Sequence, residues 1–217
     1  MGPIVIINPN STESVTHGMN AMVERLRVPY GPAIECTTLE EGPPAIETDE
    51  HVAGVVAPIC DLILRRQEEA GAFVIGCYSD PGLREARALG TRPVFGIAES
   101  AMLTAMARGS QFGVISILEE SLPRHARYVR ELGFESRCAG DRAIGLGVAD
   151  LSDAARTLER IRGVAELLRD EDGADVIILG CAGMAGNRRR LEEAVGLPVI
   201  EPTQAATVLA IGATLVA

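Results

Sequence analysis

Two cysteines in this chain are placed where a thiol could take part in chemistry. Cys77 and Cys181 each follow a short apolar run that ends in a glycine, Gly76 or Gly180. Such a run is typical of a buried parallel strand, and open α/β sheets bind ligands at the carboxyl ends of their strands. Amides of a following helix favour the thiolate form of a cysteine at this edge. We therefore interpret the two thiols as a catalytic pair rather than as two buried structural cysteines.

The segments around the two cysteines resemble each other, which indicates an internal repeat. The expected strand at 112–116 corresponds in the same way to the strand at 4–8. The predicted fold class is α/β, with two pseudo-symmetric parallel-sheet α/β lobes and the active site in the cleft between them. Residues 1–97 with the C-terminal helix 202–217 are predicted to form the first lobe, and residues 98–201 are predicted to form the second.

The composition is typical of a globular α/β protein with an aliphatic core. Of the 217 residues, 47% are hydrophobic and only 3% are aromatic, so the core must be built from Ala, Val, Ile and Leu. The formal charge of -10 argues against nucleic acid or an anionic membrane surface as a partner. We find no stretch of membrane-spanning length and no signal-type start, and we expect a cytoplasmic protein.

Apolar runs alternate with amphipathic segments along the chain, which predicts alternating strands and helices. The expected strands are 3–7, 34–39, 72–75, 93–97, 111–116, 134–138, 174–179 and 197–200. The expected helices are 13–26, 50–70, 81–89, 98–107, 118–132, 151–170, 186–195 and 202–213. Pro58 is expected to kink its helix, and Pro81 suits the first position of the helix after Cys77.

The remaining cysteines and the histidines carry no motif. Cys36, Cys60 and Cys138 lack the Gly-Cys turn and are interpreted as packing residues. An odd number of widely spaced cysteines does not predict a disulfide framework. The chain has no Cys-x-x-Cys or His-x-x-x-His spacing, so we expect no metal site. His51 and His125 fall on expected helices and are predicted to be surface residues.

Three segments in order along the chain carry a family resemblance. They are 6–12, 76–83 and 179–184, and Glu201-Pro202 follows the last strand. Together they resemble the hydantoin racemase branch of the aspartate/glutamate racemase superfamily, which also includes allantoin racemase. The resemblance spans nearly the whole chain, and it implies two similar α/β lobes, catalysis without a cofactor, a small-molecule substrate and self-association into a homo-oligomer.

The resemblance implies that Cys77 and Cys181 are the paired acid and base. One thiolate would remove the proton α to a carbonyl while the opposite thiol delivers a proton to the other face. Transfer on two sides inverts the carbon, and the two thiols exchange roles in the reverse direction. Which thiol serves which enantiomer stays open.

Departures from the amino-acid racemases of the superfamily point to the substrate class. Those enzymes usually carry Cys-Asn-Thr and Cys-Thr-His at the two thiols, where polar groups help to hold an α-carboxylate and an ammonium. Here the segments are Cys77-Tyr78-Ser79 and Cys181-Ala182-Gly183, and Asn8-Pro9-Asn10 replaces the Asp-Ser-Gly of glutamate racemases. These differences favour a neutral ring, such as a 5-substituted hydantoin or allantoin, whose enolate could be stabilised by backbone amides at the cysteine turns.

Six residues at the two cysteine turns and at equivalent strand ends are expected to bind substrate. They are Asn8, Tyr78, Ser79, Ser116, Ala182 and Gly183. Asn8 and Ser116 could instead be turn residues that end their strands. Asp80 could cap the helix after Cys77, and Glu201 could tune a thiol or cap the last helix.

Other activities are open to the same residues. Within the superfamily, paired cysteines also serve aspartate and glutamate racemases and maleate cis-trans isomerases, in which a thiol adds to a double bond. A small-ligand binding protein would keep the cleft without turnover. A redox dithiol would need the two Cα atoms within roughly 4.4–6.8 Å of each other, whereas a racemase must fit its substrate between the thiols.

Overall fold

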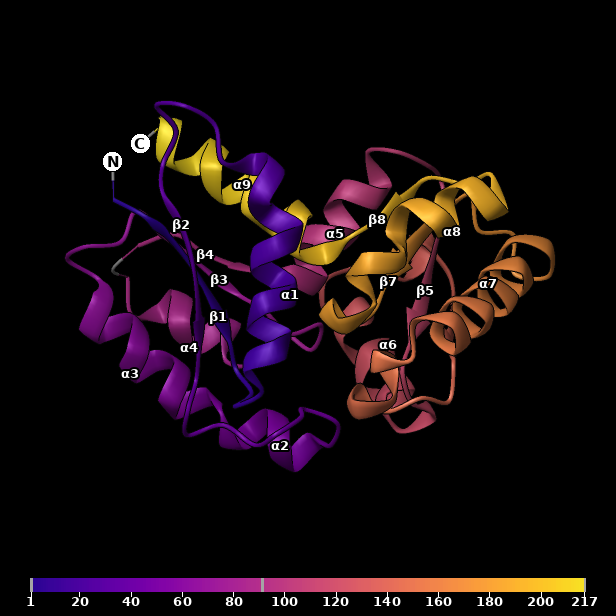
Figure 1. Cartoon of the computed structure of the whole chain (residues 1–217), viewed down its shortest axis with the longest axis horizontal. Helices are drawn as coiled ribbons and strands as arrows, with labels where there is room; N and C mark the ends of the chain where they lie inside the picture. Colours follow the sequence, from indigo (N-terminus) through magenta and orange to yellow (C-terminus); the bar gives the residue numbers. More distant parts are fainter. Residues whose placement is uncertain (1, 91, 217) are drawn as a thin grey trace. The chain divides into compact units, whose positions relative to one another are not determined.

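The computed structural model describes residues 2–90 and 92–216. The chain forms two compact units, Met1–Ser100 with Thr203–Ala217, and Ala101–Pro202. Among the described residues, each unit contains one four-stranded sheet with helices beside it (Figure 1). The predicted α/β class with two parallel sheets is therefore confirmed.

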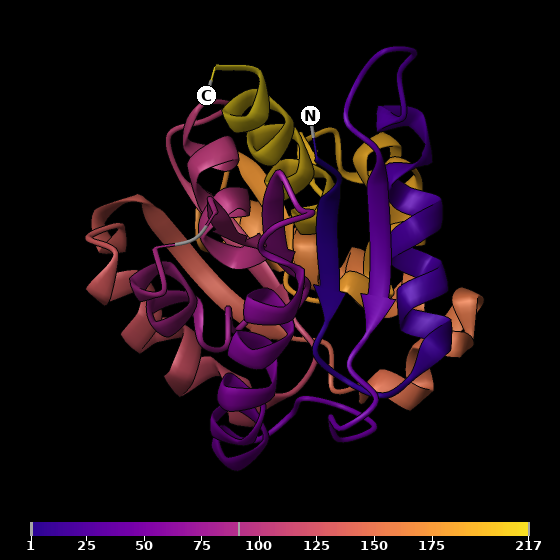
Figure 2. The ribbon, with the colours of Figure 1, turned by 90° about the vertical axis from the view of Figure 1, so that its left-hand side faces the viewer.

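The sheet of the first unit has the strand order β2-β1-β3-β4, and its neighbouring strands are all parallel. The strands are β1 (Ile4–Asn8), β2 (Ile34–Thr38), β3 (Ala72–Ile75) and β4 (Val94–Gly96). Figure 2 shows β1 and β2 side by side. Every residue of β1 and β3 is buried, because helices cover both faces of a central parallel strand.

Several helices belong wholly or partly to this unit. They are α1 (Glu13–Val23), α2 (Asp49–Gly54), α3 (Val56–Arg66), α4 (Leu83–Ala88), α5 (Ile97–Met106) and α9 (Pro202–Val216). On one face of the sheet, Val5 and Phe73 share a core cluster with Ile59 and Ile63 of α3. In the described parts of the chain, no helix is both long enough and apolar enough to cross a bilayer.

The second unit repeats this arrangement with the strand order β6-β5-β7-β8, again all parallel. The strands are β5 (Phe112–Ser116), β6 (Cys138–Ala143), β7 (Val176–Leu179) and β8 (Val199–Ile200), and the helices are α6 (Leu122–Glu131), α7 (Ala154–Asp170) and α8 (Arg188–Val195). Ile115 and Leu179 of the sheet share a core cluster with Ile161 and Leu168 of α7. Since the two orders coincide strand for strand, β1 corresponds to β5 and β3 to β7.

Some expected elements differ from the structure. The strand predicted at 134–138 is wrong, because Glu135–Arg137 form a 3-10 turn and β6 begins at Cys138. The helix predicted over 50–70 is two helices, which meet at Val55. The break lies in the turn before Pro58, which has no N–H to donate to the carbonyl of Gly54, so the expected effect of the proline is a break between two helices rather than a kink within one.

Candidate active site

Cys77 directly follows the end of β3 and its glycine. The N–H of Gly76 donates a 2.8 Å hydrogen bond to the carbonyl of Ile7 on β1. A Cβ at Gly76 would lie 2.9 Å from that carbonyl oxygen and 2.8 Å from the methyl group of Met19. Only glycine therefore lets β1 and β3 stay paired up to the cysteine. The Cys77 residue itself is partly exposed.

Cys181 has the same surroundings in the second unit. The N–H of Gly180 donates a 2.8 Å hydrogen bond to the carbonyl of Ile115 on β5, and a Cβ at Gly180 would lie 2.7 Å from that oxygen. The Cys181 carbonyl accepts from the N–H of Met184, three residues on, at 3.1 Å. A 3-10 helix, Ala182–Asn187, follows, and the cysteine is again partly exposed.

The turn after Cys77 differs from the predicted helix start. The Cys77 carbonyl accepts from the N–H of Asp80 at 2.9 Å, which matches the bond made by Cys181. Pro81 is not the first helical residue, because α4 begins only at Leu83. Asp80 and Gly82 both have positive φ, at 43° and 71°. These left-handed residues reverse the chain before the helix can start.

Asn8 ends β1 next to the Cys77 turn, and its side chain is fully buried. Its Nδ2 donates to Asn10 Oδ1 and Thr16 Oγ1, each at 3.0 Å, and to the Thr12 carbonyl at 3.2 Å. Its Oδ1 accepts from the N–H of Asn10 at 3.2 Å. Because an amide nitrogen has two protons, these partners use both of them. Asn8 therefore has no amide proton left to donate to a substrate, and its side chain holds the end of β1 against the following turn and α1.

Ser116 occupies the equivalent place at the end of β5 and is also fully buried. Its Oγ donates to Asp141 Oδ1 at 2.6 Å, and His125 Nδ1 lies 3.0 Å from the same Oγ. His125 Nδ1 also lies 2.9 Å from Asp141 Oδ2. The Ser116 hydroxyl donates its proton to Asp141, so neither Ser116 Oγ nor Asp141 Oδ2 has a proton to donate to His125. We therefore assign the imidazole proton to Nδ1, which donates to these two oxygens. The prediction that His125 lies on the surface is wrong, because its exposure is 5%.

The predicted substrate contacts fall into two groups by exposure. Ser79 and Ala182 are partly exposed and Gly183 is exposed, as a direct contact requires. Asn8, Tyr78 and Ser116 are buried. Within each unit the structure brings one buried strand-end residue and one thiol together at adjacent strand ends. The buried group can hold the edge in shape, and the exposed group can meet a ligand.

Sequence patterns alone missed two members of the Ser116 network. Asp141 lies on β6, which the predicted strand at 134–138 did not reach. His125 and Val129 are four residues apart on α6 and are both buried. That i,i+4 spacing was a signal that the histidine faces the core.

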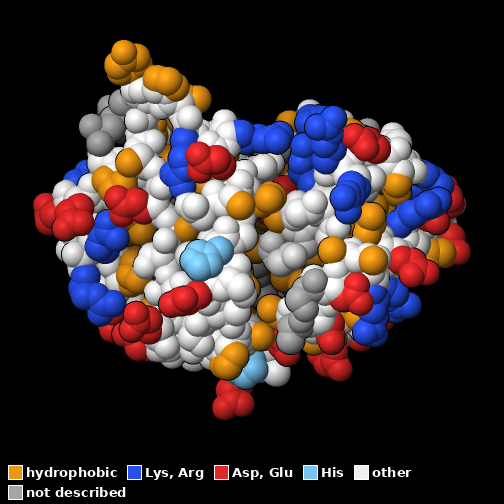
Figure 3. Space-filling view, viewed as in Figure 1, with side chains coloured by type: hydrophobic (Ala, Val, Ile, Leu, Met, Phe, Trp, Pro, Cys, Tyr) orange, Lys and Arg blue, Asp and Glu red, His pale blue; other side chains and the backbone are white. Residues whose placement is uncertain are grey.

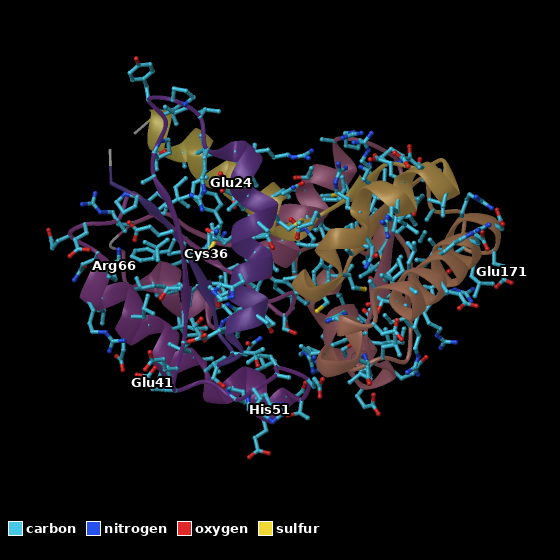
Figure 4. The ribbon with its side chains drawn as sticks, viewed as in Figure 1. Glu24, Cys36, Glu41, His51, Arg66 and Glu171 are labelled. Carbon is cyan, nitrogen blue, oxygen red and sulfur yellow. The ribbon has the colours of Figure 1, made fainter. Side chains whose placement is uncertain are left out.

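The remaining thiols lie on other elements, Cys36 on β2, Cys60 on α3 and Cys138 on β6. Cys36 on β2 belongs to the first unit (Figure 4). Burial raises the pKa of its thiol to about 11, although the Arg27 guanidinium lowers it in part. Burial, and next the Asp141 carboxylate, raise the pKa of Cys138 to about 11. Both thiols are thus held protonated at neutral pH. Glu201, which follows β8, is buried with 2% exposure.

Positive and negative side chains pair with each other on the surface of α8. On α8, Arg188 and Arg189 form ion pairs of 3.0 Å with Glu192 and Glu193, one helical turn later. Figure 3 shows basic and acidic side chains next to each other in this region. Exposed i,i+4 pairs of this kind stabilise a helix by only about 0.3–0.5 kcal/mol each.

Comparison with known proteins identifies the family of this two-unit fold. A family model described as Asp/Glu/Hydantoin racemase matches residues 4–210. The chain belongs to this family. The hydantoin racemase of Rhizobium meliloti is 38% identical over 216 residues, which cover 95% of this chain and 86% of that protein. The hydantoin racemase of Paenarthrobacter aurescens is 34% identical over 206 residues, which cover 94% of this chain and 87% of that protein.

The solved structures agree. Allantoin racemase from Klebsiella pneumoniae has a TM-score of 0.93 and 30% identity, and the match covers 100% of this chain and 89% of that chain. The family resemblance carried by the three sequence motifs is therefore confirmed. The protein is a racemase of this branch, and so an isomerase.

Proposed function

We propose that this racemase inverts the C5 carbon of a neutral hydantoin-like ring, a 5-substituted hydantoin or allantoin, with Cys77 and Cys181 as its acid and base. The observation that carries the proposal is the repeated strand-Gly-Cys turn, whose two copies make the same backbone hydrogen bonds. All five cysteines are partly exposed, so the matched turn, rather than exposure, favours chemistry over packing for Cys77 and Cys181.

In the proposed reaction, C5 of the ring loses one proton and gains another from the opposite face. A thiolate takes the C5 proton, and the electron pair left on C5 delocalises into the adjacent carbonyl as an enolate. The other thiol then donates its proton to the opposite face of C5, which inverts the centre. The products are the mirror-image ring and a thiol pair whose protonation states have exchanged. Backbone amides at the two turns are proposed to stabilise the enolate oxygen.

The turn residues favour a neutral substrate. Ala182 and Gly183 next to Cys181 have no charged or hydrogen-bonding side-chain group, and both reach the surface of their unit. An amino-acid substrate would require groups that hold a carboxylate and an ammonium. A hydantoin ring has neither, and its acidic C5 proton needs no cofactor for removal. We therefore propose cofactor-independent catalysis.

The test is proton exchange in D₂O followed by NMR and polarimetry. Single enantiomers of a 5-alkyl hydantoin and of allantoin are incubated with the protein, with L-glutamate and maleate as comparison substrates. A no-enzyme control is required because hydantoins exchange slowly by themselves. Enzyme-dependent deuterium at C5 with loss of optical rotation is expected for the rings. Turnover of L-glutamate or maleate alone would overturn the substrate assignment.

Single cysteine variants test the assignment of the two thiols. Cys77→Ala and Cys181→Ala should each lower racemisation by about 10²–10⁴-fold, the usual contribution of a positioned acid or base. Each variant keeps one base, so each should still exchange deuterium into one enantiomer without inverting it, and the two variants should prefer opposite enantiomers. Cys60→Ala is the matched control and should keep full activity. A Cys77 or Cys181 variant with full activity in both directions would contradict the mechanism.

A further inference from the structure

The carboxylate of Asp80 connects the Cys77 turn to the start of α5. Its Oδ1 accepts from the N–H of Ala98 and its Oδ2 accepts from the N–H of Glu99, each at 2.9 Å. Its own N–H donates to the Cys77 carbonyl at 2.9 Å. Asp80 is 5% exposed. One buried residue thus holds the carbonyl of Cys77 with its backbone and a helix terminus with its side chain.

These bonds replace a missing helix cap. Ala98 and Glu99 are the second and third residues of α5. The N–H groups at these two positions of a helix commonly bond to the side chain of the N-cap, the residue just before the helix. That residue is Gly96, which has no side chain. A Cβ there would lie 2.2 Å from Asp80 Cγ and within 2.5 Å of both carboxylate oxygens. The glycine is therefore required so that Asp80 can occupy the capping position.

The backbone at Asp80 is held in a costly conformation. Its φ is 43°, and Tyr30 is the other non-glycine residue with positive φ among the described residues. A left-handed conformation is disfavoured for a residue with a side chain and persists only where surrounding contacts impose it. A glycine at position 80 would adopt this φ without strain. Only a carboxylate there can accept the two hydrogen bonds from the backbone of α5.

We infer that Asp80 is a positioning residue that fixes the backbone of the Cys77 turn against the amino terminus of α5, and that the thiol depends on this backbone for its position. This inference rests on the proposed role of Cys77 in proton transfer. The competing interpretation is that Asp80 only caps α5 and that the thiol is indifferent to it. The two interpretations predict different activities for a variant in which another residue caps α5 but no side chain connects the Cys77 turn to this helix.

The chain allows such a restoration. Asp80→Ala removes both the cap and the connection, and it also empties the space next to Gly96. In that background Gly96→Ser places a hydroxyl at the N-cap position, where serine is a preferred capping residue. The double variant Asp80→Ala/Gly96→Ser thus has a capped α5 but no bond from the Cys77 turn to it. Asp80→Asn keeps one acceptor oxygen and should fall between the wild type and Asp80→Ala.

Asp175 provides a matched control. Its two carboxylate oxygens also accept from consecutive backbone amides, those of Ser110 and Gln111, each at 2.9 Å. A Cβ at Gly109 would likewise lie 2.4 Å from Asp175 Oδ1. Asp175 precedes β7, however, and so lies at the end of the strand away from Cys181. Asp175→Ala should lower the thermal midpoint without changing turnover.

Three quantities are measured on each variant: the thermal midpoint, kcat and KM on the hydantoin, and the alkylation rate of Cys77 by iodoacetamide from peptide mass spectrometry. Asp80→Ala should lower kcat by about 10- to 100-fold, since a misplaced catalytic group can cost 10²-fold. It should also speed alkylation several-fold, because the turn is released. In the double variant the midpoint should return to the wild-type value, while kcat stays low and alkylation stays fast.

Recovery of kcat and of the alkylation rate together with the midpoint would overturn the inference and leave Asp80 as a cap only. A kcat for Asp80→Ala within about twofold of wild type would also overturn it, given the 10²-fold effect expected of misplacement. If the wild type does not exchange any hydantoin proton, the proposed function fails. The alkylation and midpoint measurements then still decide the role of Asp80, because neither depends on turnover.

Discussion

At the residue scale, the ends of β1 and β5 are held by two networks of different chemical type. Asn8 joins Thr16 of α1, whose hydroxyl lies 2.6 Å from that of Thr38 on β2. Ser116 joins His125 of α6 and Asp141 of β6. The positions correspond, but the first network contains only amides and hydroxyls and the second contains ionisable groups. The repeat has therefore kept the place of the network and changed its chemistry.

The Ser116 network should show strong energetic coupling. Ser116→Ala leaves Asp141 and His125 with a lost partner in a buried site, which should cost about 1–3 kcal/mol of unfolding free energy. A double-mutant cycle of Ser116→Ala with Asp141→Asn, measured by urea denaturation, should give a coupling free energy of about 0.5–3 kcal/mol. The exposed Ser136→Ala paired with Asp141→Asn should be additive. Additivity in the Ser116 pair would show that the three side chains do not act together.

Cys36 should make the protein less stable in alkali. Its pKa is raised from 9.0 to about 11 by burial, so the folded state holds a proton that the unfolded state has released between these values. Its stabilising effect is fully present below pH 9 and is lost as the pH rises towards 11. Cys36→Ala should flatten this decline in urea-unfolding free energy measured from pH 8 to 11. An unchanged slope would mean that Cys36 titrates alike in both states.

At the element scale, the two glycines before the thiols set how closely the central strands approach. Gly180→Ala should cost about 1–3 kcal/mol, because its Cβ would meet a backbone oxygen that cannot move freely. Gly212→Ala is the contrasting variant, since Gly212 is exposed on α9 and a Cβ there meets nothing within 4 Å. It should stabilise the protein by about 0.4–1 kcal/mol. Thermal unfolding of both variants checks the pair, and a neutral Gly180→Ala would contradict the close approach.

Apolar runs predicted most strands well, because a central parallel strand must be apolar on both faces. β6 was the exception, since its six residues are all partly exposed and include Asp141 and Arg142. A strand of this kind has no apolar signal. The start of α4 was misplaced for another reason. Pro81 suits a first helical position, but the left-handed Asp80 and Gly82 on either side of it are set by contacts with other parts of the first unit.

At the scale of the whole molecule, the repeat made the candidate site predictable. Two Gly-Cys turns in one sequence predicted equivalent strand ends. In the structure the two turns make the same backbone hydrogen bonds. The long-range partners were not predictable. Asp80 reaches an amide of α5 that lies 19 residues away, and Ser116 reaches a carboxylate 25 residues away. Local sequence patterns do not indicate which residues will form such distant pairs.

α9 should be required by the first unit more than by the second. Ala206 and Ala210 are fully buried, and Gln204 Nε2 donates to the Met22 carbonyl at 2.9 Å. A chain ending at residue 201 should exchange the amides of β1 and β3 much faster in hydrogen-exchange mass spectrometry, while β5 and β7 keep more protection. A chain lacking only 216–217 is the control, since Val216 is 87% exposed. Equal protection of the two sheets in the shorter chain would contradict the assignment.

The division of the first unit between both ends of the chain also sets an order of events during synthesis. Residues 101–202 form one continuous unit, whereas the first hundred residues are joined by 203–217. A ribosome that adds about 5–20 residues per second takes about 5–20 s to make the intervening hundred. During that interval residues 1–100 exist without α9. The unit that is begun before the other is thus completed after it, and the apolar surface that α9 covers is where a chaperone would have the longest time to bind.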